Sequence, residues 1–141
     1  MQYISTRGQD GPLGYEAALL SGLARDGGLY LPVEYPRFTV DEIRDMSGLS
    51  YAALAGRIMA RFTDGEIGEA ELTAMADDAY ADFTDPEIAP LRQLNDRIHV
   101  MELFHGPTIA FKDYAMQFLS RAFDRALRSA GRQAVILGAT S

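Results

Sequence analysis

The last third of the sequence contains a strand pattern, a long helical pattern and a second strand pattern, and this succession restricts the fold more than any other feature. Ile98, Val100 and Leu103 are the apolar members of an alternating segment over 97–103. From 114 to 130, apolar residues recur in pairs at helical spacing, and 133–137 is a short apolar run of buried-strand type. Strand, helix and strand predict a βαβ unit with two parallel strands and a right-handed crossover.

Lys112 is the only lysine in the chain, and it lies where the first strand segment passes into the helix. The other basic side chains are arginines, which do not lose their proton and so cannot serve as amine nucleophiles. Apolar residues 109–111 precede Lys112. Burial and the positive end of the helix dipole would both favour the neutral amine, which condenses with an aldehyde to form a Schiff base. The alternative is that an arginine-rich composition has spared one lysine without a function.

The carboxyl edge of the predicted sheet collects the other candidate site residues. Ligands gather beyond the carboxyl ends of parallel strands, and both the Lys112 loop and the loop 138–141 leave from that edge. If the two strands are neighbours, Thr140 and Ser141 would reach a carboxylate whose amine is bonded at Lys112. His105 lies in the same loop region and is a further candidate for substrate contact, whereas His99 alternates within the strand and is interpreted as a surface or structural histidine.

The region before the βαβ unit is expected to be mainly helical, with short strands. Asp85, Pro86 and Pro90 mark a connector, so the chain divides into an amino-terminal region, 1–85, and the beginning of a three-layer α/β domain, 86–141. A capping box of Thr39 and Glu42 predicts the start of one helix. The expected elements of the first region are strands at 2–6 and 29–31 and helices at 13–23, 39–47, 50–62 and 68–81.

The charge and residue content exclude several classes of function. A net charge of −7 and no basic cluster argue against binding to nucleic acid or anionic lipid. The absence of cysteine excludes disulfides and thiolate metal sites, and the acid-rich helix at 68–81 lacks histidine partners, so no metal is expected. No apolar run approaches the roughly 20 residues of a membrane span. We therefore expect a cytoplasmic protein.

Three blocks of sequence resemble the threonine synthase family of fold-type II pyridoxal-phosphate enzymes. The block Gly106–Asp113 is similar to the lysine motif of that family. The blocks Tyr3–Gly8 and Ala18–Pro32 resemble its amino-terminal region, in the same order. The likeness extends over nearly the whole chain, and three ordered blocks favour this family over other fold-type II enzymes that carry similar lysine motifs.

The resemblance implies a pyridoxal-phosphate-dependent lyase of amino-acid biosynthesis that converts O-phospho-L-homoserine and water to L-threonine and phosphate. In the family, the lysine corresponding to Lys112 forms the internal aldimine with the cofactor and then shuttles protons. The Thr-Ser loop corresponding to Thr140 and Ser141 helps to hold the substrate carboxylate. Phe111 and Asp113 are given structural roles, as an apolar neighbour and a first-turn helix acid.

The resemblance stops at Ser141, before the glycine-rich loop that binds the cofactor phosphate and the partner of the pyridine nitrogen. We therefore expect residues 1–141 to be inactive alone and to self-associate through the strand edges and the apolar sheet face of the βαβ unit. Two alternatives remain open from the sequence. A related fold-type II enzyme, such as a dehydratase or a sulfhydrylase, would share Lys112 without preferring phosphohomoserine. A non-catalytic helical interaction module would leave Lys112 unmodified.

Overall fold

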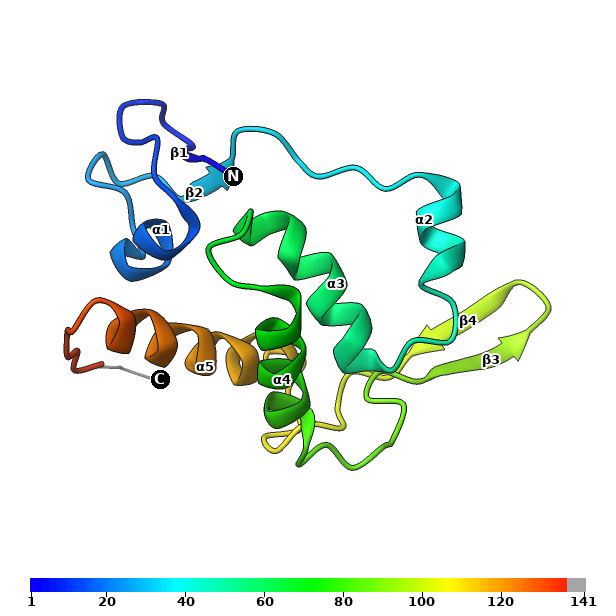
Figure 1. The fold of residues 1–141 in the computed structure, drawn as a ribbon. Coiled ribbons are helices and arrows are strands. Elements are labelled where there is room, and N and C mark those ends of the chain that lie inside the picture. The colour runs from blue at the N-terminus through cyan, green and yellow to red at the C-terminus, as the bar shows by residue number, and fades with distance from the viewer. Residues whose placement is uncertain (137–141) are drawn as a thin grey trace.

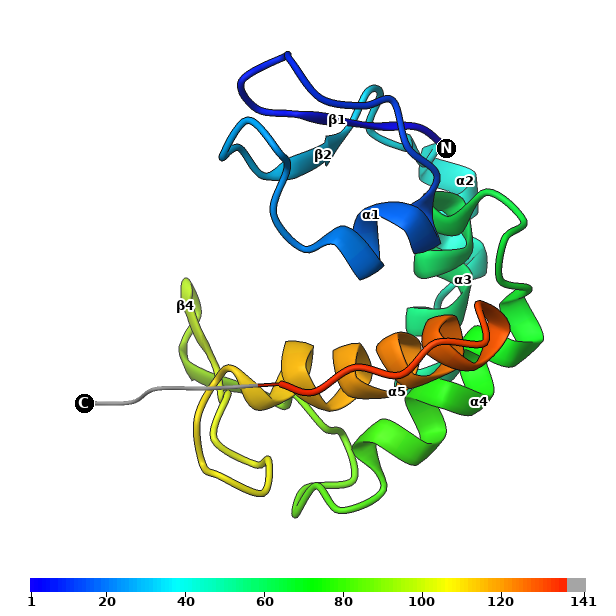
Figure 2. The same cartoon turned by 90° about the vertical axis from the view of Figure 1, so that its left-hand side faces the viewer.

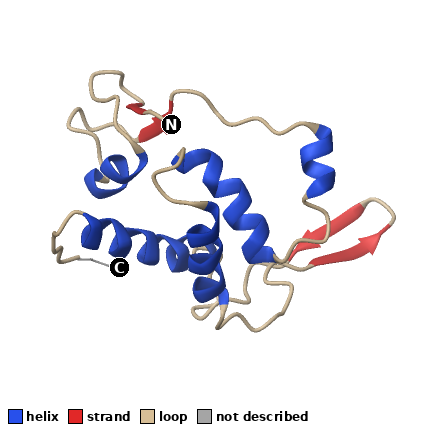
Figure 3. Cartoon of the chain, in the orientation of Figure 1, coloured by secondary structure: helices blue, strands red, loops and turns tan. Residues whose placement is uncertain are grey.

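The computed structural model describes residues 1–136 as a mixed α/β chain in which helices predominate (Figures 1 and 3). The six segments predicted before the connector are confirmed as elements of the predicted type, with slightly different bounds. In chain order, the elements are β1 (Tyr3–Ser5), α1 (Tyr15–Ser21), β2 (Tyr30–Pro32), α2 (Val40–Asp45), α3 (Tyr51–Thr63), α4 (Glu69–Tyr80), β3 (Leu91–Asn95), β4 (Ile98–Met101) and α5 (Asp113–Ser129).

The first 32 residues form a small unit around a buried carboxylate. Strands β1 and β2 pair antiparallel, with Tyr3 opposite Pro32, and α1 lies between them in sequence. Asp10 is only 6% exposed and accepts hydrogen bonds from the Arg25 side chain, at 2.7 Å, and from the Tyr30 hydroxyl, also at 2.7 Å. The Arg25 side chain and backbone, followed by the Tyr30 hydroxyl, hold the pKa of Asp10 well below its usual range. These bonds tie the loop before α1 to the two segments that follow it.

Helices α2 and α3 begin at side-chain caps, as the sequence predicted. The Thr39 hydroxyl accepts a hydrogen bond from the Glu42 backbone N–H at 3.2 Å, and the Glu42 carboxylate accepts one from the Thr39 N–H at 2.7 Å. Ser50 caps α3 by accepting from the Ala53 N–H at 3.2 Å. At the other end of α3, Asp64 adopts a left-handed conformation with φ 50°, which stops the helix before Gly65.

The core lies where α3, α4 and α5 pack together. Leu72 and Ala76 of α4 and Ala122 of α5 are fully buried. Small side chains allow these helices to approach closely, and at Gly56 of α3 a Cβ would lie only 2.2 Å from the Thr73 hydroxyl of α4. The core therefore draws residues from both sides of the connector at 85–90. The division into 1–85 and 86–141 stays a prediction.

A β-hairpin precedes α5 where the sequence analysis expected a connector and one strand. Strand β4 covers part of the predicted segment 97–103, but it pairs antiparallel with β3, which the sequence analysis missed. The Asn95 side chain accepts hydrogen bonds from the N–H groups of Arg97 and Ile98, at 3.0 and 3.1 Å, and so builds the turn. Every residue of both strands is exposed, and the hairpin extends away from the helices (Figure 1).

No parallel strand pair is present within 1–136. The described strands form two antiparallel pairs, β1 with β2 and β3 with β4. The predicted helix is confirmed as α5, which ends at Ser129. Gly131, with φ 61°, and an Arg132 N–H bond to the Leu127 carbonyl at 2.9 Å close its last turn. Residues 132–136 then run back along α5 without strand structure, although 133–137 was predicted as a strand (Figure 2). A strand requires ladder partners, and none of the described strands pairs with residues 132–136. The parallel βαβ arrangement stays a prediction.

Among the described residues, no helix has the length and apolar character needed to cross a bilayer. The same residues contain no group of three or more histidine, aspartate or glutamate side chains placed to hold a metal ion.

The half-buried Tyr3 and the buried Tyr80 predict a loss of stability at alkaline pH. The Tyr3 hydroxyl donates to the Phe62 carbonyl and the Tyr80 hydroxyl to the Tyr114 carbonyl, each at 2.9 Å. Burial raises the pKa of both tyrosines from 10.0 to about 12. The folded state therefore holds these protons more tightly than the unfolded chain does. The resulting stabilisation is complete below pH 10 and is lost as the pH rises towards 12.

Urea unfolding followed by circular dichroism at pH 8, 10, 11 and 12 measures this effect. The urea midpoint should be steady from pH 8 to 10 and fall above pH 10. Tyr80→Phe should reduce the fall, whereas Tyr35→Phe, at a residue 59% exposed, should leave it unchanged. A midpoint independent of pH up to 12 would contradict the burial of these hydroxyls.

Candidate active site at the start of α5

Lys112 occupies the N-cap position of α5, at the end of a loop that begins after Phe104. Its backbone already has helical angles, φ −64° and ψ −22°, and its carbonyl accepts the Met116 N–H at 2.9 Å. The predicted position at the start of the helix is therefore confirmed. The predicted burial of the Lys112 amine is wrong, since within residues 1–136 the Lys112 side chain is exposed. The apolar neighbours do not cover it, since Ile109 is 73% and Phe111 66% exposed.

Asp113, the residue after Lys112, is a buried carboxylate bonded to the preceding loop. It is 3% exposed, and one of its oxygens accepts the Thr108 backbone N–H at 2.8 Å. The Thr108 hydroxyl lies 2.9 Å from each carboxylate oxygen. Burial opposes ionisation of Asp113, but the hydrogen bonds from Thr108 outweigh it, and the pKa of Asp113 lies below its ordinary value. Asp113 is therefore a structural acid, as predicted, with a specific partner.

The loop is closed tightly over this carboxylate. A Cβ at Gly106 would lie 2.5 Å from the Asp113 Cβ, so only glycine fits there. The Ile109 N–H donates to the Gly106 carbonyl at 3.1 Å, and the Asp113 N–H donates to the Ala110 carbonyl at 3.0 Å. Ile109 has φ 63°, a conformation that β-branched residues seldom adopt. The path of the loop is thus imposed by these contacts against the local preference of Ile109.

His105 ties the base of the loop to neighbouring segments. Its Nδ1 lies 3.2 Å from the Thr84 hydroxyl, and its Nε2 lies 2.8 Å from the Glu102 carboxylate. Its backbone carbonyl accepts the Thr84 N–H at 2.9 Å. The adjacent Tyr114 hydroxyl donates to the Ile88 carbonyl at 2.6 Å. Both ring nitrogens of His105 are thus engaged within the protein, and its contact with substrate stays a prediction.

Thr140 and Ser141, the predicted carboxylate-binding residues, lie outside the described residues. Their approach to Lys112 therefore stays a prediction. The bonds of Thr108 to Asp113 were not predicted from the sequence. A hydroxyl residue five positions before an acid at the start of a helix was the available signal.

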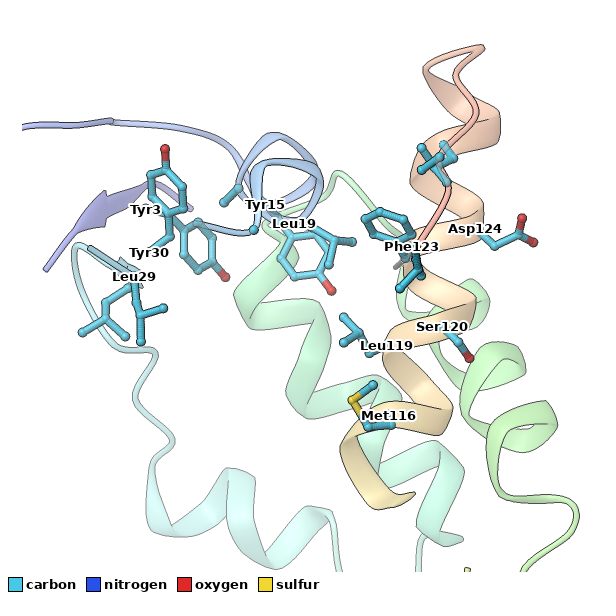
Figure 4. Close-up of a pocket in the computed structure, with 16 residues that line it drawn as sticks. Tyr3, Tyr15, Leu19, Leu29, Tyr30, Met116, Leu119, Ser120, Phe123 and Asp124 are labelled. Carbon is cyan, nitrogen blue, oxygen red and sulfur yellow. The ribbon is translucent and has the colours of Figure 1, made fainter. Parts of the chain in front are cut away.

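An apolar cavity of about 850 Å³ lies between the amino-terminal unit and α5 (Figure 4). Tyr3, Tyr15 and Leu19 line one wall, and Met116, Leu119 and Phe123 line the other. Ala134 and Ile136, which follow α5, also contribute. The lining carries few polar groups, so the cavity is suited to packing and not to acid–base chemistry.

Charged contacts hold α5 against the rest of the chain. The Arg125 Nε donates to Glu71 of α4 at 2.8 Å, and Arg125 also pairs with Glu16 of α1. The Glu66 carboxylate accepts the backbone N–H groups of Tyr15 and Glu16, at 2.8 and 2.9 Å, and so caps α1 in place of Gly14, which has no side chain. These contacts fix the direction of the helix that begins at Lys112.

The fold is shared with solved threonine synthases. The pyridoxal-phosphate-bound enzyme from Brucella melitensis is similar with a TM-score of 0.89 and 50% identity, over 93% of this chain and 28% of that one. The yeast enzyme is similar with a TM-score of 0.84 and 38% identity, over 92% of this chain and 27% of that one. The chain therefore has the mixed α/β fold that forms one part of these larger biosynthetic enzymes.

The sequence makes this assignment specific. A family model described as threonine synthase N terminus matches residues 2–80. The threonine synthase of Pseudomonas aeruginosa is 51% identical over 141 residues, which is 100% of this chain and 30% of that protein. This chain belongs to the threonine synthase family, as its three sequence blocks indicated. It spans about 30% of the length of the curated relatives from Pseudomonas aeruginosa and Methylobacillus glycogenes.

Proposed function

We propose that this chain supplies the amino-terminal part of a threonine synthase, which converts O-phospho-L-homoserine and water to L-threonine and phosphate with pyridoxal phosphate as cofactor. The observation that carries the proposal is the position of Lys112. It is the only lysine of the sequence, its side chain is exposed, and it stands at the start of α5 in the motif that resembles the family. A primary amine condenses with an aldehyde cofactor, and the Lys112 amine is accessible, so this residue fits covalent attachment.

The roles proposed for the residues follow from their chemistry and position. Lys112 binds the cofactor and, once released by the substrate amine, holds and moves protons at its Nζ atom. Thr140 and Ser141 donate hydrogen bonds to the substrate carboxylate. The cofactor, when bound, acts as an electron sink for the substrate carbon atoms. Asp113 and His105 contribute to the shape of the loop that carries Lys112.

Phosphate release from O-phospho-L-homoserine tests the proposal. Residues 1–141 alone should release none, because the contacts expected for the cofactor phosphate and ring nitrogen are not among their motifs. A chimera in which this chain replaces the matching 30% of the Pseudomonas enzyme should release phosphate and form threonine. Turnover by residues 1–141 that disappears on mutation of Lys112 would contradict the first expectation. An inactive but folded chimera would contradict the proposed function.

We also propose that residues 1–141 self-associate, through strand edges and through apolar side chains that α5 leaves exposed beside the cavity. Leu119 and Met116, on the α5 wall, are 40% and 55% exposed. Sedimentation equilibrium should give a mass that rises with concentration, and Leu119→Asp should lower it. Val40→Asp, at an exposed position of α2 outside the cavity, should not. A stable monomer with strong amide-exchange protection over 133–137 would contradict this expectation.

Two further assignments remain proposals. We place the protein in the cytoplasm, an assignment that is compatible with the absence of cysteine. We also keep the division into an amino-terminal region, 1–85, and the beginning of the pyridoxal-phosphate domain, 86–141.

A further inference from the structure

We propose that Thr108 and Asp113 form a clamp that positions Lys112, and that both are positioning residues for the reaction. The inference rests on the proposed function, because it concerns the placement of the amine that binds the cofactor. Thr108 and Asp113 are called the Thr108–Asp113 clamp below. They lie on either side of Lys112 in the sequence, and their bonds close the loop 108–113 into a ring from which the lysine side chain emerges.

The clamp is unusually complete for a loop at the surface. Asp113 is 3% exposed, and it receives the Thr108 N–H at 2.8 Å and the Thr108 hydroxyl at 2.9 Å. Buried carboxylates are costly unless they are hydrogen-bonded, so the loop is stabilised only in the conformation that supplies these donors. The close approach of Gly106 to Asp113 and the positive φ of Ile109 show how strongly this conformation is imposed.

The lysine itself depends on this backbone arrangement. Within residues 1–136, the Lys112 amine makes no hydrogen bond or ion pair, and its side chain is exposed. Among the described residues, the placement of Lys112 therefore depends on its backbone. A displacement of about 1 Å at a reacting group can lower a rate about 100-fold. Loosening the clamp should thus reduce turnover while leaving the amine available to the cofactor.

Two substitutions at residue 108 separate the hydroxyl from the volume of the side chain. Thr108→Val has nearly the same shape and no hydroxyl donor, whereas Thr108→Ser keeps the hydroxyl. In the chimera, Thr108→Val should lower kcat about 10- to 100-fold. KM should change by less than about threefold, because the substrate contacts are kept. The amount of cofactor that borohydride fixes at Lys112 should also change by less than about threefold, because the amine is still present. Thr108→Ser should restore kcat to within about threefold of the parent.

A second measurement tests, in the absence of cofactor, how firmly the Lys112 backbone is held. In residues 1–141, the NMR order parameter of the Lys112 N–H should be about 0.85 in the parent and in Thr108→Ser, and below about 0.6 in Thr108→Val. Residues of α3 and α4 should stay ordered in all three. Asp124→Asn, which alters an exposed carboxylate farther along α5, is the matched control and should change neither kcat nor this order parameter.

The outcomes distinguish the inference from the function on which it rests. If Thr108→Val keeps both the order of Lys112 and the parent kcat, the clamp does not position the lysine, although the function stands. If the parent chimera neither binds cofactor nor turns over, the proposed function fails, while the order parameter still tests the clamp. If Thr108→Val does not fold, Asp113→Asn replaces it, since it keeps the shape and removes one acceptor. Parent-like kcat in folded Asp113→Asn would then overturn the inference.

Discussion

Lys112→Arg is expected to stop threonine formation in the chimera with the Pseudomonas enzyme while leaving the fold largely intact. Arginine keeps a cation at an exposed position, but its guanidinium does not condense with an aldehyde. Phosphate release should fall at least about 1,000-fold, the scale on which loss of a covalent catalyst lowers turnover. The circular dichroism spectrum and the unfolding midpoint should change little, because Lys112 makes no side-chain hydrogen bond within residues 1–136.

Reduction with borohydride in the presence of pyridoxal phosphate locates the reacting amine. Peptide mapping of the parent chimera should place the label on the segment 111–113, and Lys112→Arg should remove it. In residues 1–141 alone, labelling should be weak, and the Met1 amino group is the only other primary amine of that chain. Full activity of Lys112→Arg, or a label at another residue of a cofactor-binding chimera, would show that Lys112 does not bind the cofactor.

A matched control introduces a second amine on the same helix. Arg128→Lys places it near the end of α5, at a side chain that is 75% exposed. If exposure alone decided labelling, the amine introduced at position 128 would be labelled as strongly as Lys112. We expect the label to stay on Lys112, because the motif around it, and not its exposure, selects the cofactor.

The helices were predictable because each carries its own signals. Thr39 and Ser50 are caps that act over three residues, and Gly131 has the left-handed conformation that ends α5. Such contacts depend on sequence neighbours alone. Strand β4 was predicted from its alternating residues, but its antiparallel partner β3 was not. Every residue of β3 is exposed, so its sequence does not alternate and resembles that of a connector.

The sequence predicted which residue lies at the centre of the site, but it did not predict the surroundings of that residue. Lys112 stands at the start of α5, as its sequence context indicated. The direction of the side chains around it was not predictable, because Ile109 and Phe111 are apolar yet point to solvent. The bonds of Thr108 to Asp113 depend on the path of the loop and on the positive φ of Ile109, and no residue pattern encodes such a path directly.

Leu72→Ala should be the most destabilising single substitution among those considered. Leu72 is fully buried on α4, within the core shared by α3, α4 and α5. Truncation to alanine removes buried methyl groups and leaves a cavity, at a cost of about 2–5 kcal/mol. Domains of this size are stable by about 5–15 kcal/mol, so the change should lower the urea midpoint strongly or unfold the chain. Urea titration followed by circular dichroism measures it.

Leu94→Ala is the matched control, because it removes the same atoms from a leucine that is 66% exposed in β3. Its free energy of unfolding should change by less than about 0.5 kcal/mol. The difference in free energy of unfolding between the two variants separates the effect of burial from that of secondary-structure propensity. Alanine is favoured in a helix, as at Leu72, and disfavoured in a strand, as at Leu94. Propensity alone would therefore make Leu94→Ala the more harmful change. Equal losses in both variants would mean that α3, α4 and α5 do not form the core from which α5 presents Lys112.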